Sequence, residues 1–307
     1  MTSLGLLVMA YGGPDSLDDV GPYLLDIRGG RPTPPALVEE IRDRYRRIGG
    51  SSPLRAITEA QAAALGRELR RRGMAVTVAV GMRHWHPRIA TAVEMLAEQG
   101  VTSGVGLALA PHYSRRSVGA YQDQVRAAVA GLARPLRFGF VSHFGDHPRF
   151  VAAVARDLGR IRESLHDAEA ARVLFSAHSL PADWVSGGDP YPKQLRASAE
   201  SVAASAGLEP SQWRLCYQSA GARPGTWLGP PLEDEVRRAA ADGVREVTVV
   251  PFGFVADHVE ILFDVDIELR ELADSLGVTV TRTPSLGTDA ELIAALADRV
   301  QGAAALI

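Results

Sequence analysis

Apolar segments of strand length alternate along this chain with longer segments of helical periodicity. The short segments are hydrophobic at consecutive positions, which is typical of parallel strands covered by helices on both faces. In the longer segments, apolar residues recur three and four positions apart, and several segments end at glycine, as helices often do. Strands are therefore predicted at residues 5–11, 76–82, 104–112, 136–142, 171–178, 213–219, 246–254 and 278–284.

The alternation divides the chain into two similar halves. Four predicted strands lie before about residue 145 and four lie after residue 170, and a predicted helix over 147–165 joins the two groups. This order predicts an α/β protein with two Rossmann-like domains, residues 1–165 and 166–307, each built on a parallel sheet. The final helix is assigned to the second domain, and the alternative is that it packs against the first domain.

A histidine stands at the end of the fifth predicted strand, in the segment FSAHSLP. Ligands of open α/β sheets bind beyond the carboxyl ends of the strands, so this end is a candidate site. The imidazole of His178 can act both as a metal ligand and as a proton acceptor, because its unperturbed pKa is about 6.5. Ser176 and Ser179 are expected to orient the ring by hydrogen bonds. The alternative is a strand-end histidine bonded only to backbone.

Acidic residues recur every four positions in the segment DHVEILFDVDIE. On a helix, Glu260, Asp264 and Glu268 would share one face. Their carboxylates could pass a divalent cation along or accept protons, and burial would raise their pKa values. The apolar flanks predict that part of this row lies in a cleft, and the alternative is a solvated acidic stripe. His258 could cap this helix or support Glu260.

Composition and charge exclude several classes of protein. The chain has 307 residues, of which 46% are hydrophobic and 22% charged, as in soluble globular proteins. A formal net charge of -3 offers no basic surface for nucleic acid. The first apolar run is too short to cross a bilayer, so we expect a cytoplasmic protein without stable membrane insertion. Cys216 is the single cysteine, which excludes an internal disulfide.

Nine motifs resemble those of the ferrochelatase family, most closely its coproporphyrin type, over essentially the whole chain. They stand in family order and spacing: LLVMAYGGP, DIRGGRP, RYRRIGGSSPL, ALAPHYSRRSV, FSAHSLP, GDPYPKQL, YQS, WLGP and PFGFVADHVEILFDVD. The resemblance implies a class II chelatase-like fold with a cleft between the domains. It also implies insertion of ferrous iron into coproporphyrin III, which gives coproheme. A protoporphyrin IX ferrochelatase and a non-catalytic tetrapyrrole carrier on the same fold are the alternatives.

The resemblance also implies roles for individual residues. His178 and Glu260 match the catalytic pair that faces the macrocycle and binds the metal, with Asp264 and Glu268 as outer carboxylates. Tyr11 matches a tyrosine that reaches the metal from the opposite face. Positions that bind propionates or line the pocket are matched by Arg28, Arg44, Tyr45, Ser52 and Tyr121. In the segment HWH, family position places His84 near the pocket rim and leaves His86 without a role.

Two departures from the family pattern change the expectations. Many actinobacterial relatives carry four cysteines that hold a [2Fe-2S] cluster, which Cys216 alone cannot hold. Gly13 replaces a threonine in the turn after Tyr11, which is expected to loosen that turn. We therefore expect no cofactor beyond the substrate Fe²⁺. The expected partners are the porphyrin, ferrous iron and a downstream enzyme that accepts coproheme.

Overall fold

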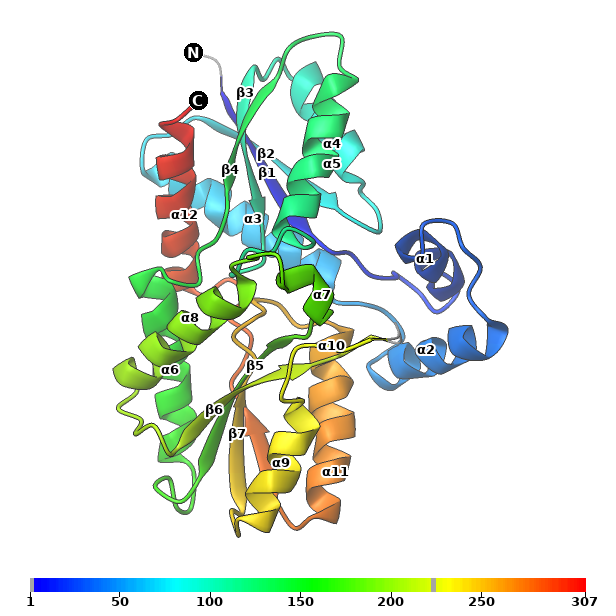
Figure 1. The fold of residues 1–307 in the computed structure, drawn as a ribbon. Coiled ribbons are helices and arrows are strands. Elements are labelled where there is room, and N and C mark those ends of the chain that lie inside the picture. The colour runs from blue at the N-terminus through cyan, green and yellow to red at the C-terminus, as the bar shows by residue number, and fades with distance from the viewer. Residues whose placement is uncertain (1–2, 222–224) are drawn as a thin grey trace.

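Two α/β units stacked end to end make up the computed structural model, which describes residues 3–221 and 225–307 (Figure 1). The first unit contains a parallel sheet in the order β2-β1-β3-β4. Its strands span Leu4–Ala10 for β1, Val76–Met82 for β2, Ser103–Ala108 for β3 and Arg137–Val141 for β4.

The second unit repeats this order with the remaining strands, as β6-β5-β7-β8. In each sheet the second strand in sequence lies on one side of the first strand, and the third and fourth strands lie on its other side. The carboxyl ends of β1 and β5 therefore lie at the point where such folds bind ligands. The strands span Arg172–His178 for β5, Trp213–Gln218 for β6, Glu246–Val250 for β7 and Thr279–Arg282 for β8.

All eight predicted strands are present and both sheets are parallel, so the predicted fold class is confirmed. The predicted ends of two strands are wrong. β3 ends at Ala108 rather than at residue 112, and β7 ends at Val250 rather than at 254. Pro111 and Pro251 follow these ends, and proline has no backbone N–H to donate to a sheet ladder. The apolar runs continue past both strand ends and hide them in the sequence.

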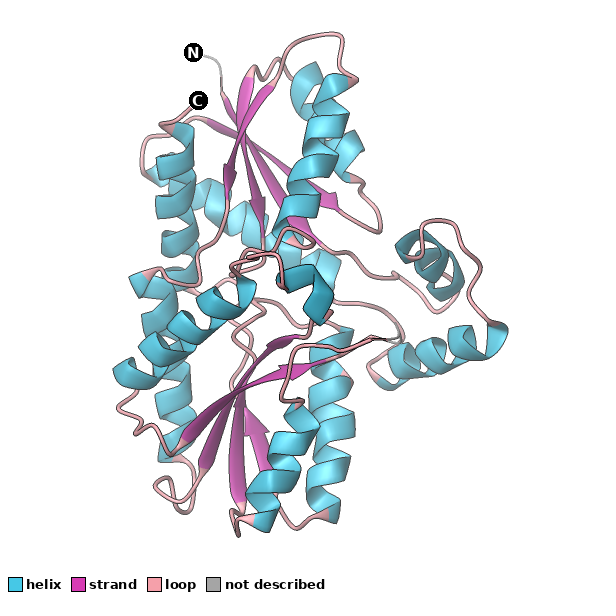
Figure 2. Ribbon diagram, in the orientation of Figure 1, coloured by secondary structure: helices cyan, strands magenta, loops and turns pink. Residues whose placement is uncertain are grey.

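Helices cover both faces of each sheet, as Figure 2 shows. A pair of helices, α1 and α2, instead stands out to one side of the sheets (Figure 1). The helices before residue 165 are α1 (Val20–Ile27), α2 (Pro35–Arg47), α3 (Leu54–Arg71), α4 (Ile89–Glu98), α5 (Val118–Ala130) and α6 (Pro148–Glu163). Those after it are α7 (Ala182–Val185), α8 (Tyr191–Ser205), α9 (Leu232–Ala241), α10 (Val259–Leu262), α11 (Arg270–Ser275) and α12 (Ala290–Ala304).

The last helix returns to the first sheet. α12 lies against α3, α6 and β4, and an ion pair joins Arg72 at the end of α3 to Asp298 on α12. One buried cluster contains Leu6 from β1, Phe175 from β5 and Val300 from α12. The two sheets thus share a continuous hydrophobic core, which fixes the strand ends of one sheet opposite those of the other.

Within residues 3–221 and 225–307, no helix combines the length and the apolar composition that crossing a membrane requires.

Candidate active site

A cleft of about 810 Å³ lies where the carboxyl ends of the two sheets face each other. Its volume falls in the range of ligand pockets, roughly 300–1,000 Å³. Eight residues singled out from the sequence line it: Tyr11, Tyr45, Ser52, His84, Tyr121, His178, His258 and Glu260. The fold therefore brings residues from both halves of the chain to one site.

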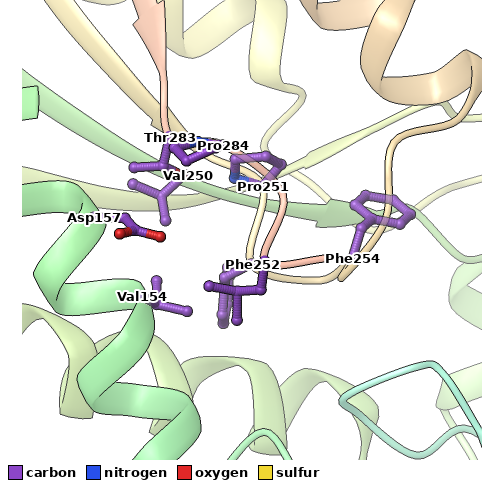
Figure 3. A pocket seen from close by; sticks show the side chains of 9 residues that line it. Val154, Asp157, Val250, Pro251, Phe252, Phe254, Thr283 and Pro284 are labelled. Atoms are coloured by element: carbon purple, nitrogen blue, oxygen red, sulfur yellow. The ribbon is translucent and has the colours of Figure 1, made fainter. Parts of the chain in front are cut away.

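A second hollow, of about 10 Å³, lies between α6 and the loop after β7. Val154 and Asp157 line it from α6, and Pro251 and Phe252 face them (Figure 3). A cavity of this size holds at most one water molecule. The large cleft is therefore the candidate active site.

His178 is the last residue of β5 and points into the cleft beside Glu260. Its Nδ1 donates a hydrogen bond to Glu260 Oε2 at 2.9 Å. In the neutral imidazole this bond requires the proton on Nδ1, so Nε2 carries the lone pair, and Nε2 has no hydrogen-bond partner among the described residues. Although the pair lies deep in the molecule, 35% of the His178 side chain and 30% of the Glu260 side chain remain exposed, because the cleft is open.

The two members of this pair shift each other's pKa. Burial lowers the pKa of His178, but the Glu260 carboxylate outweighs burial and raises it above its usual value. Burial raises the pKa of Glu260, but His178 and then His258 outweigh burial and hold it well below its usual range. The expectation of a raised pKa for Glu260 is therefore wrong, because a histidine compensates the buried charge. The pair combines a permanent carboxylate with an imidazole of increased basicity.

Gln218, the last residue of β6, holds the backbone of Glu260 in place. Its Nε2 donates to the Glu260 carbonyl oxygen at 2.7 Å, and its Oε1 accepts from Ser176 Oγ at 2.8 Å. Ser179 Oγ donates to the Leu228 carbonyl oxygen at 2.8 Å. The prediction that the two serines orient the His178 ring is therefore wrong, because both hydroxyls are used elsewhere. Gln218 was missed, although the motif YQS places it at a strand end.

His258 supports Glu260 rather than capping α10. It makes no side-chain capping bond to that helix. Its Nδ1 donates to the Ala256 carbonyl oxygen at 3.1 Å, and its Nε2 lies 3.7 Å from Glu260 Oε2. Of the two options open from the sequence, the structure therefore supports the second.

The acidic row continues from α10 into a π-helical turn, η1 (Asp264–Leu269). The row descends from the cleft to the surface. Asp264 is mostly buried, with 13% of its side chain exposed, and Glu268 is exposed. Burial, assisted by the charge of Glu260, raises the pKa of Asp264 to about 6, against an opposing hydrogen bond donated by Ser219. Asp264 and Glu268 do not line the cleft itself.

An arginine in β8 fixes the segments on both sides of Glu260. Arg282 Nε and Nη2 donate to the two carboxylate oxygens of Asp266 in η1, each at 2.8 Å. Arg282 Nη2 also lies 3.3 Å from Asp257 Oδ1, in the loop before α10. The side chain is 11% exposed, so these charge-assisted bonds are shielded from water. Arg282 therefore ties the position of Glu260 to the second sheet.

Tyr11 follows β1 on the opposite wall of the cleft, with 40% of the residue exposed. Although the open cleft leaves part of the residue exposed, its location deep in the molecule raises the pKa of Tyr11 to about 12, against the opposing charge of Arg83, and the phenol is neutral at pH 7. The turn after it is tightly packed. A Cβ at Gly13 would lie 2.5 Å from Ser52, and the Tyr23 hydroxyl donates to the Gly12 carbonyl oxygen at 3.0 Å. Ser52 thus occupies the space that a side chain at position 13 would need, and the expected loosening of this turn stays a prediction.

The predicted arginines lie outside the cleft lining. Arg44 Nη1 is 3.6 Å from Asp264 Oδ1, and its guanidinium lies 5.1 Å from the ring centre of Phe263. Arg28 follows the end of α1. His84 does line the cleft and contacts Asp26 Oδ2 at 2.9 Å, whereas His86 is exposed and outside the lining.

Three other arginines line the cleft instead: Arg83, Arg115 and Arg116. Their sequence context did not distinguish them from surface arginines, although all three follow strand ends in the segments GMRHWH and APHYSRRS. Among the described residues, no group of three or more His, Cys, Asp or Glu side chains is arranged to hold a metal ion.

The ferrochelatase family model matches residues 3–304 of this chain. The chain belongs to the ferrochelatase family. It is 41% identical to the ferrochelatase of Deinococcus radiodurans, over 98% of this chain and 96% of that protein. It is 38% identical to the coproporphyrin III ferrochelatase of Geobacillus thermodenitrificans, over 96% of this chain and 94% of that protein. The family resemblance seen in the nine motifs is thus confirmed, and the protein is a metal chelatase that acts on a porphyrin.

Solved structures of other chelatases share the fold. The sirohydrochlorin chelatase SirB from Bacillus subtilis subspecies spizizenii, solved with cobalt, aligns with a TM-score of 0.60 over 99% of this chain and 96% of that chain. Its sequence identity is 15%, so the similarity shows the fold alone. The class II chelatase-like architecture is therefore confirmed.

Proposed function

We propose that this ferrochelatase inserts ferrous iron into coproporphyrin III and releases coproheme. The main support is the hydrogen bond from His178 Nδ1 to Glu260, which leaves the Nε2 lone pair free in a cleft large enough for a tetrapyrrole. Metal insertion requires a base that accepts two pyrrole protons and a ligand that holds Fe²⁺ only transiently. This pair provides both groups on one wall of the cleft.

In the proposed mechanism, the macrocycle lies between the wall of Tyr11 and the wall of His178. Nε2 of His178 takes a pyrrole proton, and the Glu260 carboxylate stabilises the imidazolium that forms. Because the pKa of Glu260 is held low, its carboxylate stays ionised and available to iron. The second pyrrole proton follows after His178 has lost the first.

The acidic row offers a route by which these protons leave the cleft. Asp264 lies next along the row, and its pKa of about 6 allows it to take up and release a proton near neutral pH. Glu268 continues the row to the surface. We assign these two carboxylates an outer role in proton or iron transfer, behind the catalytic pair.

The proposal extends to the cofactors and partners of the protein. It includes no resident cofactor, no iron–sulfur cluster and no nucleic-acid partner. The reaction is placed in the cytoplasm, and the product passes to an enzyme that accepts coproheme. Tyr45, Ser52 and Tyr121 line the cleft and can donate hydrogen bonds to propionates.

The choice of porphyrin is tested by comparing kcat/KM for coproporphyrin III and protoporphyrin IX with Fe²⁺ under anaerobic conditions. Coproporphyrin III carries four propionates and protoporphyrin IX two, so the second substrate leaves donors of the site unpaired. Each lost charge-assisted hydrogen bond costs roughly 1.5–3 kcal/mol, so we expect a preference of more than about tenfold for coproporphyrin III. Equal values, or the reverse preference, would favour a protoporphyrin IX ferrochelatase. Binding without turnover would indicate a tetrapyrrole carrier.

A further inference from the structure

Arg83, Arg115 and Arg116 meet on one side of the cleft, although they come from different loops. Arg83 follows β2, and the other two follow β3, so they flank β1 and Tyr11. Arg83 Nη1 donates to the Arg116 carbonyl oxygen at 3.1 Å, which joins the two loops. These are the arginines that line the cleft in the described part of the chain.

None of these guanidinium groups forms an ion pair with a carboxylate of the described residues. Aromatic rings hold two of them instead. The Arg83 guanidinium lies 5.6 Å from the ring centre of Tyr121, and that of Arg116 lies 5.4 Å from the ring centre of Trp184. A guanidinium over a ring keeps the N–H donors at its edge available. Arg83 Nε is also buried without a hydrogen-bond partner, which is unusual for a buried donor.

The second domain fixes the loop that carries Arg115 and Arg116. Asp189 Oδ2 accepts hydrogen bonds from the Arg115 backbone N–H at 2.7 Å and from Ser114 Oγ at 3.0 Å. The first turn of α5 follows at once, and its partial positive charge adds to that of the arginines. The loop is therefore held in place before any ligand binds.

The cleft lining contains little negative charge that could neutralise these arginines. Its acidic residues among those described are Glu260 and Asp123. Glu260 is bonded to His178 on the far wall, and Asp123 Oδ1 pairs with Arg126 at 2.8 Å. The cations on this side are therefore free to bind an anion that enters the cleft.

We propose that Arg83, Arg115 and Arg116 form a carboxylate subsite that binds propionate side chains of the tetrapyrrole. This inference rests on the proposed function, since it assigns the substrate's carboxylates to specific residues. Arg83 is half-buried and takes a carboxylate inside the cleft, and the exposed Arg115 and Arg116 take one at its mouth. The subsite selects porphyrins with several carboxylates, as coproporphyrin III has.

The test uses the double variant Arg115→Gln/Arg116→Gln and the single variant Arg83→Gln. Fluorescence titration gives the dissociation constants of coproporphyrin III and protoporphyrin IX, and steady-state assays give kcat and KM. Loss of charge-assisted hydrogen bonds is expected to weaken coproporphyrin III binding about tenfold in the double variant. Protoporphyrin IX binding should weaken less, and kcat should change less than about twofold because the reacting nitrogens are not touched.

Three further comparisons separate charge from structure. Arg115→Lys/Arg116→Lys keeps the charge and should retain most of the affinity. Arg134→Gln removes an exposed arginine from the loop before β4, at the opposite end of the sheet. This control variant should keep the wild-type dissociation constants for both porphyrins. Raising the salt concentration from about 0.05 to 0.5 M should weaken coproporphyrin III binding to the wild type more than to the double variant, because salt screens the exposed charges.

The outcomes distinguish this inference from the proposed function. Unchanged affinity for coproporphyrin III in the double variant and in Arg83→Gln would overturn the subsite, even if the wild type inserts iron at full rate. A wild type that metallates neither porphyrin would instead overturn the proposed function. Melting curves identify misfolding of the Arg83 variant, and the double variant then carries the test alone, since both of its residues are exposed.

Discussion

The two sheets share one strand order, yet they present different chemistry at matching strand ends. Tyr11 follows β1, whereas His178 ends β5. Arg83 follows β2, whereas Gln218 ends β6. The first wall of the cleft therefore offers phenols and arginines, and the second offers an imidazole paired with the Glu260 carboxylate. The repeated fold supplies two equivalent platforms, and the function comes from the difference between their side chains.

We propose that this difference separates substrate binding from proton and metal chemistry. The first wall presents neutral phenols and guanidinium donors that suit carboxylates. The second wall has a histidine whose basicity is increased by Glu260. Changes on the first wall should therefore act mainly on KM, and changes on the second mainly on kcat.

The largest effect is expected for His178→Ala, which removes the base from the second wall. General acid–base groups contribute about 10²- to 10⁴-fold, so kcat should fall by at least that range. Porphyrin affinity should change little, because the first wall provides the anchoring donors. Anaerobic iron-insertion assays and fluorescence titration measure the two quantities. Turnover near that of the wild type would contradict the assigned role of the histidine.

Glu260→Gln should have the next largest effect. The variant lacks the carboxylate charge that is proposed to bind iron and to stabilise the imidazolium of His178. Its kcat should therefore fall by about tenfold or more. Because Glu260 raises the pKa of His178 against burial, its loss should lower that pKa. The acidic limb of kcat/KM should then move to lower pH. An unmoved limb would show that Glu260 does not set the basicity of His178.

Asp264→Asn tests the buried carboxyl behind the pair. Its pKa is raised from 3.8 to about 6, so the native state binds this proton more tightly than the unfolded state does. The contribution of Asp264 to stability is thus greatest below pH 4 and falls as pH rises to about 6, by up to about 3 kcal/mol. Denaturant unfolding of the iron-free variant should lack this decrease. The same pH dependence in both proteins would contradict the raised pKa.

Tyr11→Phe should have the smallest effect on turnover. The phenol is proposed to reach the iron of the product from the face opposite His178. Removing one hydroxyl should change the absorption and electron paramagnetic resonance spectra of the bound ferric product and slow insertion only slightly. The packed turn around Gly13 and Ser52 supports firm positioning of this side chain. Identical spectra for the two proteins would remove Tyr11 from the iron site.

Much of the fold could be predicted from the sequence because strands buried on both faces are continuously hydrophobic. The ends of β3 and β7 could not, since apolar residues continue beyond them to Pro111 and Pro251. His178 and Glu260 could be singled out because the histidine ends a predicted strand, the glutamate begins a row of carboxylates at helical spacing, and both match family motifs. Their mutual pKa shifts depend on a 2.9 Å contact across 82 positions of sequence, which periodicity does not reveal.

Other parts of the site depend on three-dimensional packing. The spacing of the acidic row predicts a helix, but not the π-helical turn at Asp264–Leu269 that Arg282 and Asp266 anchor. Arg115 and Arg116 resemble ordinary surface arginines until the cleft lining is known. Sequence patterns identify the strands and their order, but they do not show which charged side chains from separate loops face the same cavity.

The most direct test is an anaerobic time course of wild-type protein with coproporphyrin III and Fe²⁺, both in large molar excess. If the two walls together form a chelatase site, the metallated porphyrin should exceed the protein many times over, and omission of the protein should leave the reaction slow. Metallation that stops at one porphyrin per chain, or that proceeds no faster than without protein, would contradict this account.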